Sequence, residues 1–89
     1  MTHMEYRVGQ RVRSKAGRDK GTDYCVIRTE GNYVYAADGA ARKLDRLKKK
    51  KIKHVEGSYD VSEEIARRVA DGTVENHMLR KFLKNEKEF

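Results

Sequence analysis

The chain has 89 residues, a hydrophobic fraction of 37% and a formal net charge of +7. This length suits one small domain, and no apolar run approaches the roughly 18 residues of a membrane-spanning helix. Because the N-terminus also lacks the apolar region of a signal peptide, we expect a cytoplasmic protein. The only cysteine, Cys25, has no second thiol for a disulfide or a zinc site, so we expect neither a metal nor a cofactor.

Five short runs in the first part of the chain have the composition or the alternation of β-strands. They cover residues 6–14, 22–29, 33–37, 41–44 and 47–55. The second and third runs flank a Glu-Gly-Asn turn, which predicts a hairpin. The number and spacing of the five runs are typical of a small β-barrel.

The last third of the chain has helical periodicity. Asp60 and Glu63 fit a capping box at the start of one helix, and Asp71 with Gly72 would end it. Thr73 would cap a second helix, whose apolar face consists of Val74, Met78, Leu79, Phe82 and Leu83. We therefore expect a mostly β fold with C-terminal α structure: a barrel of about five strands over residues 1–56, with two short helices over residues 57–89 packed on it.

The positive charge is concentrated in one segment. Residues 42–54 carry eight Lys/Arg against one Asp/Glu, whereas residues 55–89 carry six against eight. Such a density is costly through mutual repulsion unless an anion lies nearby. The leading classes of partner are therefore nucleic acid and an anionic membrane surface, and we expect nucleic acid rather than a membrane.

A second basic cluster lies on a glycine-containing loop before the second expected strand. Arg18 and Lys20 flank Asp19, which could hold the turn by accepting hydrogen bonds within the loop. Gly17 and Gly21 permit a tight turn and a close approach of backbone N–H groups to a phosphate. The alternative interpretation is an exposed polar hairpin loop without a ligand.

These two clusters supply the candidate RNA-binding residues. They are Arg13, Lys15, Arg18, Lys20, Gly21, Arg42, Lys43, Arg46, Lys48, Lys49, Lys50, Lys51 and Lys53. Tyr24, Tyr33 and Tyr35 are candidates for stacking on unpaired bases, although alternating strands also bury tyrosines. No local Cys/His or Ser/His/Asp motif is recognisable, so we expect a protein without catalytic activity.

Residues 8–27 resemble a KOW motif, in which a strand, a charged loop with a characteristic glycine and a second strand follow one another. Gly21 would be that glycine. Including the basic segment, roughly residues 6–55 resemble the archaeal and eukaryotic large-subunit ribosomal proteins of the fourteen-e type and their short bacterial relatives. The resemblance implies an SH3-like β-barrel that binds RNA, often ribosomal RNA, through loop and edge residues.

The expected function is non-catalytic RNA binding in translation, through basic loops that hold phosphates of ribosomal RNA or of the large ribosomal subunit. Residues 55–89 are slightly acidic, unlike the basic C-terminal extension of those ribosomal proteins, which favours a factor that visits ribosomes. The alternative is a protein-interaction module of the transcription or translation machinery, docking through its C-terminal helices. Nonspecific DNA binding is also open.

Overall fold

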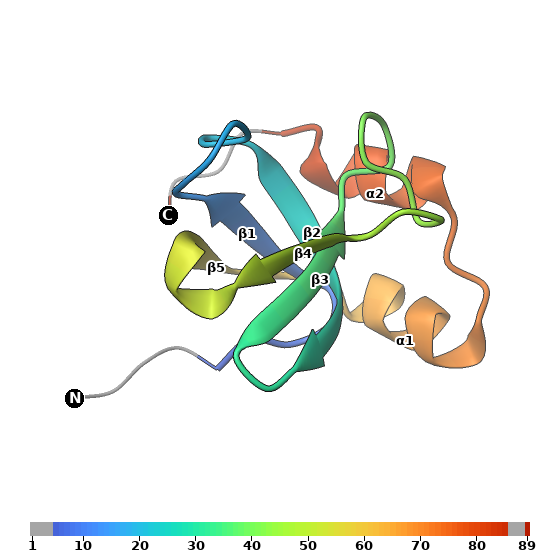
Figure 1. The fold of residues 1–89 in the computed structure, drawn as a ribbon. Helices are drawn as coiled ribbons and strands as arrows, with labels where there is room; N and C mark the ends of the chain where they lie inside the picture. Colours follow the sequence, from blue (N-terminus) through green and yellow to red (C-terminus); the bar gives the residue numbers. More distant parts are fainter. Residues whose placement is uncertain (1–4, 86–88) are drawn as a thin grey trace.

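The computed structural model describes residues 5–85 and Phe89, which form an antiparallel sheet followed by two helices (Figure 1). The strands are β1 (Gln10–Ser14), β2 (Asp23–Glu30), β3 (Tyr33–Ala37), β4 (Lys48–Lys51) and β5 (Val55–Val61). A 3₁₀ turn, η1 (Ile52–His54), joins β4 to β5, and the helices are α1 (Glu63–Asp71) and α2 (Asn76–Leu83). The predicted mostly β fold with two C-terminal helices is confirmed.

The strand order in the sheet is β4-β3-β2-β1-β5, and each neighbouring pair is antiparallel. Its two edge strands, β4 and β5, are joined by η1 but form no ladder with each other within residues 5–85. The sheet is therefore open, and its arrangement is compatible with a small SH3-like barrel.

Two of the expected strands differ from the structure. The run 41–44 lies in the loop between β3 and β4, and the fifth strand is β5. Val55 and Ser58 are buried in β5, which pairs with β1 through Ser14 and Val55. The sheet therefore continues past residue 56, where the expected barrel ended.

The helix starts also differ from the expected ones. Asp60 still belongs to β5, so Ser62 caps α1 instead, with its hydroxyl oxygen accepting a hydrogen bond from the Ile65 N–H at 3.1 Å. Thr73 hydrogen-bonds to Asp71, and α2 begins only after Glu75. The predicted end of α1 is confirmed, because Gly72 adopts the left-handed conformation (φ +77°) that glycine tolerates best.

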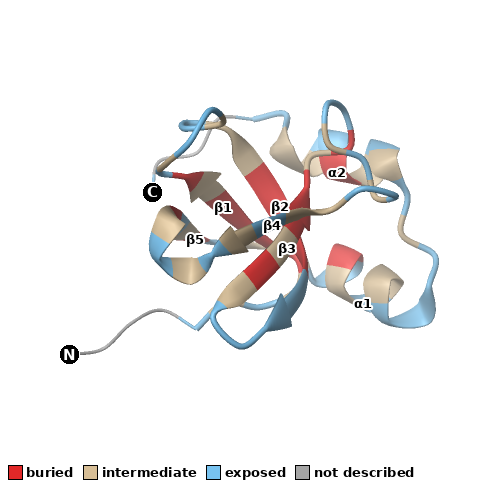
Figure 2. Ribbon diagram, in the orientation of Figure 1, coloured by how far each residue is buried: buried red, intermediate tan, exposed pale blue. Residues whose placement is uncertain are grey.

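Both faces of β2 are buried from Tyr24 to Ile27, whereas its last three residues are exposed. Figure 2 shows the buried stretch at the centre of the sheet. On one face lies a cluster of Val12, Tyr24, Val26, Val34, Ala36 and Val55. On the other face, Cys25 and Ile27 contact the helices through Ile65 of α1 and Leu79 of α2. Burial, and after it the charge of Asp60, raises the pKa of the Cys25 thiol to about 12, so Cys25 stays protonated at neutral pH.

The apolar face of helix α2 packs against this second cluster. Leu79 is fully buried, and Val74, Phe82 and Leu83 pack half-buried against the same residues. The apolar face that prompted the docking hypothesis therefore holds α2 on the sheet. Neither helix in the described part of the chain is long and apolar enough to cross a membrane.

Replacing Leu79 tests this packing. Leu79→Ala leaves a cavity under α2, so we expect the free energy of unfolding to fall by about 2–5 kcal/mol. Urea denaturation measures the loss, and Lys81→Ala, at an exposed position of the same helix, is the matched control. Equal stability of the two variants would contradict the packing of α2 on β2.

Candidate nucleic-acid interface

Two basic loops leave the sheet at the same end. The first basic loop, residues 15–22, joins β1 to β2, and the second basic loop, residues 38–47, joins β3 to β4. Cys25 near the start of β2 pairs with Ala37 at the end of β3, which sets both loops at one end of the strands (Figure 1). Sequence positions about 20 residues apart thus come together because neighbouring strands are antiparallel.

The carboxylate of Asp19 fastens the first basic loop to the sheet. Its oxygens accept hydrogen bonds from the Ser14 hydroxyl at 2.8 Å, the Tyr24 hydroxyl at 2.7 Å and the Lys50 ammonium at 3.1 Å. Lys50 Nζ also donates to the Ala16 carbonyl at 3.0 Å. The loop is therefore tied to β1, β2 and β4 at once. Asp19 holds the turn, as predicted, but its carboxylate accepts hydrogen bonds from the neighbouring strands instead of from within the loop.

These contacts set the protonation of the groups involved. Partial burial alone would raise the pKa of Asp19, but hydrogen bonds from Tyr24, Ser14 and Lys50, together with the charge of Lys50, lower it to about 2. Burial and the hydrogen bond to Asp19 raise the pKa of Tyr24. Asp19 is thus ionised and Tyr24 protonated across the physiological pH range.

The cations of the first basic loop take no part in this clamp. Lys15, Arg18 and Lys20 are exposed, and within residues 5–85 and 89 their side chains form no hydrogen bond or ion pair. Gly21 has φ +91°, which a residue with a side chain rarely adopts. Its N–H donates to the Ser14 carbonyl at 2.9 Å, so Gly21 shapes the turn.

The second basic loop is held by its own Asp38 and by helix α2. The Asp38 carboxylate accepts hydrogen bonds from the N–H groups of Ala40 at 2.9 Å and Arg42 at 2.8 Å. From α2, Asn76 Oδ1 accepts the Leu44 N–H at 2.8 Å, and Arg80 Nη1 donates to the Gly39 carbonyl at 2.7 Å. Helix α2 therefore positions this loop as well as covering β2.

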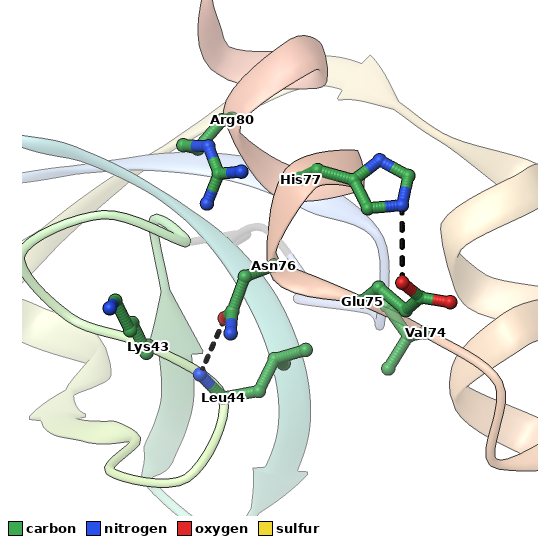
Figure 3. A pocket seen from close by; sticks show the side chains of 7 residues that line it. All are labelled: Lys43, Leu44, Val74, Glu75, Asn76, His77 and Arg80. Atoms are coloured by element: carbon green, nitrogen blue, oxygen red, sulfur yellow. Dashed lines mark hydrogen bonds and ion pairs between the residues drawn. The ribbon is translucent and has the colours of Figure 1, made fainter.

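The contact between the loop and α2 is close. A Cβ atom at Gly39 would collide with the Asn76 carbonyl, and Gly39 has φ +78°. A hollow of about 470 Å³ lies beside this contact. Figure 3 shows its lining, with Lys43 and Leu44 on the loop side and Asn76, His77 and Arg80 on the helix side. Only a residue without a side chain fits at Gly39.

Lys43 and Arg46 are the exposed cations of the second basic loop. Arg42 is half-buried and donates through Nη1 to the Arg46 carbonyl at 3.3 Å. The end of the sheet therefore presents five exposed cations on two fastened loops. They are Lys15, Arg18, Lys20, Lys43 and Arg46.

Because successive side chains of a strand point to opposite faces, the four lysines of β4 fall into two pairs. Lys50 points to the Asp19 clamp, and Lys48 is half-buried opposite Ala36. Lys49 and Lys51 are exposed and pair with Tyr35 and Tyr33 of β3. Lys53, on η1, is exposed as well.

Three of the predicted residues have structural roles. Tyr24 is only 4% exposed within the core and is not accessible to a base, which corrects its assignment as a stacking residue. Arg13 Nε donates to Asp23 at 2.6 Å, and its guanidinium lies 4.1 Å from the centre of the Phe89 ring. Lys50 is buried in the clamp, with its side chain 10% exposed. Of the remaining predicted cations, Arg42 and Lys48 are half-buried and the others are exposed.

The positioning role of α2 could not be found from the sequence. Asn76 and Arg80 lie more than thirty residues from the loop carbonyls and amides that they bind. Asp38 did carry a signal, because an Asp-Gly pair is typical of turns in which the carboxylate accepts local N–H groups.

Comparison with protein-family models and with curated proteins finds no match to this chain. Within residues 5–85 and 89, no cluster of His, Cys, Asp and Glu side chains is arranged to hold a metal ion.

The Asp19 clamp predicts a specific dependence of stability on pH. The pKa of Asp19 is lowered on folding from an ordinary value near 3.9 to about 2. The clamp therefore contributes fully above pH 4, and its contribution is lost as the pH falls towards 2. We expect Asp19→Asn to lose about 1–2 kcal/mol at pH 7, a deficit that shrinks across this window.

Urea denaturation at a series of pH values measures this difference. Asp45→Asn, at an exposed position of the second basic loop, removes the same charge and should show a much smaller deficit. An Asp19→Asn deficit that stayed constant from pH 7 to pH 2 would contradict the assigned role of the ionised carboxylate.

Proposed function

We propose that this protein is a non-catalytic RNA-binding protein whose two basic loops bind phosphates of a structured RNA. The observation that carries the proposal is the set of five exposed cations on loops that the Asp19 clamp and α2 hold at one end of the sheet. A polyanion gains most from cations whose positions are set before binding, because less side-chain and loop entropy is lost.

The arrangement of charge supports a phosphate backbone as the ligand. Two of the three acidic side chains on the loops are engaged, Asp19 with Lys50 and Asp38 with backbone N–H groups, whereas Asp45 is exposed. The five exposed cations form no ion pair within residues 5–85 and 89, and so they remain available to a ligand. Contacts of this kind position a protein on nucleic acid and carry little base selectivity.

The resemblance of residues 8–27 to a KOW motif favours RNA over DNA. That motif is typical of small barrels that bind RNA through the loop between their first two strands, and here this loop carries Lys15, Arg18 and Lys20. Ribosomal RNA is the first class to test, because the wider resemblance is to large-subunit ribosomal proteins. The helix-docking alternative has less support, since the apolar face of α2 packs on the sheet.

Salt-dependent binding tests the proposal. Five phosphate contacts predict that log K falls with log salt at a slope of about −4.5 for a duplex or −3.5 for a single strand. Removing two cations from either loop, as Arg18→Gln with Lys20→Gln or Lys43→Gln with Arg46→Gln, should reduce the slope by about 1.4–1.8. Fluorescence anisotropy with a labelled fragment of ribosomal RNA measures it.

The matched control removes two exposed cations from the helices, Arg67 and Lys81, and should leave the slope unchanged. Competition with unlabelled duplex DNA separates RNA binding from nonspecific DNA binding. If the loop pairs and the helix pair had equal effects, binding would depend on net charge alone, and the proposed interface would be wrong.

A further inference from the structure

The outer surface of β2, β3 and β4 carries a patch that the basic loops do not use. Tyr33 and Tyr35 project from β3 on the same face, and Lys51 and Lys49 lie opposite them on β4. Arg28 of β2 pairs with Tyr35 on the other side. We call the surface formed by these five residues the tyrosine–lysine face.

The helices do not cover this face, although it is continuous with the face that they do cover. Ala37 and Leu47 pack in the cluster beneath α1 and α2. Tyr35, two residues before Ala37, is half-buried, and Lys49, two residues after Leu47, is exposed. Two aromatic rings flanked by cations thus remain at the surface.

Each ring is in contact with a cation. Lys49 Nζ lies 4.3 Å from the centre of the Tyr33 ring, and the Arg28 guanidinium lies 4.0 Å from the centre of the Tyr35 ring. The Tyr35 hydroxyl donates to Glu30 at 3.1 Å, which holds the outer edge of that ring. The rings are therefore positioned, and cations occupy the places that a base would take.

We propose that the tyrosine–lysine face binds an unpaired stretch of RNA, with bases on Tyr33 and Tyr35 and phosphates on Lys49, Lys51 and Arg28. This inference rests on the proposed RNA-binding function and names the form of RNA that the protein selects. A base stacked on an aromatic ring contributes more to binding than a cation held over the same ring near solvent. A base can therefore replace the cation, which moves to the adjoining phosphate.

The spacing of the rings indicates unpaired bases. Tyr33 and Tyr35 are two residues apart on one strand, which separates them by about 6.6 Å. Stacked bases in a duplex rise only about 3.4 Å along each strand, and their faces are covered by their neighbours. Two bases can occupy both rings only when the RNA strand is extended and its bases are unstacked.

The position of β4 connects this face to the basic loops. Arg46 ends the basic part of the second loop, and Lys49 follows it by three residues, which span at most about 10 Å. An RNA whose phosphates lie on the second basic loop can therefore continue along β4 as a single strand. The ligand predicted by this geometry has a paired region next to an unpaired one.

The test compares a blunt RNA duplex with the same duplex carrying a single-stranded extension. We expect the extension to increase the affinity of the unaltered protein, and Tyr33→Leu or Tyr35→Leu to reduce this gain by about 5-fold to 100-fold. The matched variants Tyr33→Phe and Tyr35→Phe keep the ring and should keep the gain. Circular dichroism confirms that each variant is folded, and Lys49→Gln, at an exposed site, tests the face without altering a ring.

The possible outcomes separate the two proposals. The stacking inference would be overturned if the extension gave no gain in affinity, or if neither the Leu variants nor Lys49→Gln reduced that gain. The phosphate interface would stand in both cases. If neither RNA bound at low salt, both proposals would fail. Equal loss of affinity in the Phe and Leu variants would assign the effect to the tyrosine hydroxyls and would also overturn stacking.

Discussion

The ion pair and hydrogen bonds around Asp19 are the interaction on which the proposed interface depends. One carboxylate joins a loop between two strands to Lys50, which lies on a strand at the edge of the same sheet. Without this contact, the first basic loop would carry three mutually repelling cations on a glycine-containing turn. With it, Lys50 holds the loop in place and is not itself available to a ligand. The remaining cations still repel one another, but they are held in positions where an anion can bind to them.

The second basic loop meets the same requirement through hydrogen bonds to its backbone rather than through an ion pair. Asn76 and Arg80 of α2 bind backbone atoms of this loop, and Gly39 allows the close approach. The helices that follow the sheet are therefore part of the binding architecture, although they contribute few of the exposed cations. Stability and function are coupled here, because displacing α2 from β2 would also release the loop.

The sequence predicted the fold class and the basic character of the site more accurately than the role of each residue. Composition and alternation indicate strands, and the charge of residues 42–54 indicates a polyanion, because both signals are local. Whether a given lysine points outward or into the sheet depends on register, which placed Lys50 in the clamp and Lys49 on the tyrosines. The burial of Tyr24 and the strand at Val55–Val61 depend equally on pairing partners distant in sequence.

The most direct test of this account maps the bound RNA on the protein by NMR. Amide chemical shifts of the ¹⁵N-labelled chain would be followed during titration with an RNA that contains a duplex and a single-stranded extension. The account predicts changes concentrated in the two basic loops and along the tyrosine–lysine face, with α1 and β5 little affected. Changes centred on α1 or β5, with the basic loops unaltered, would contradict it.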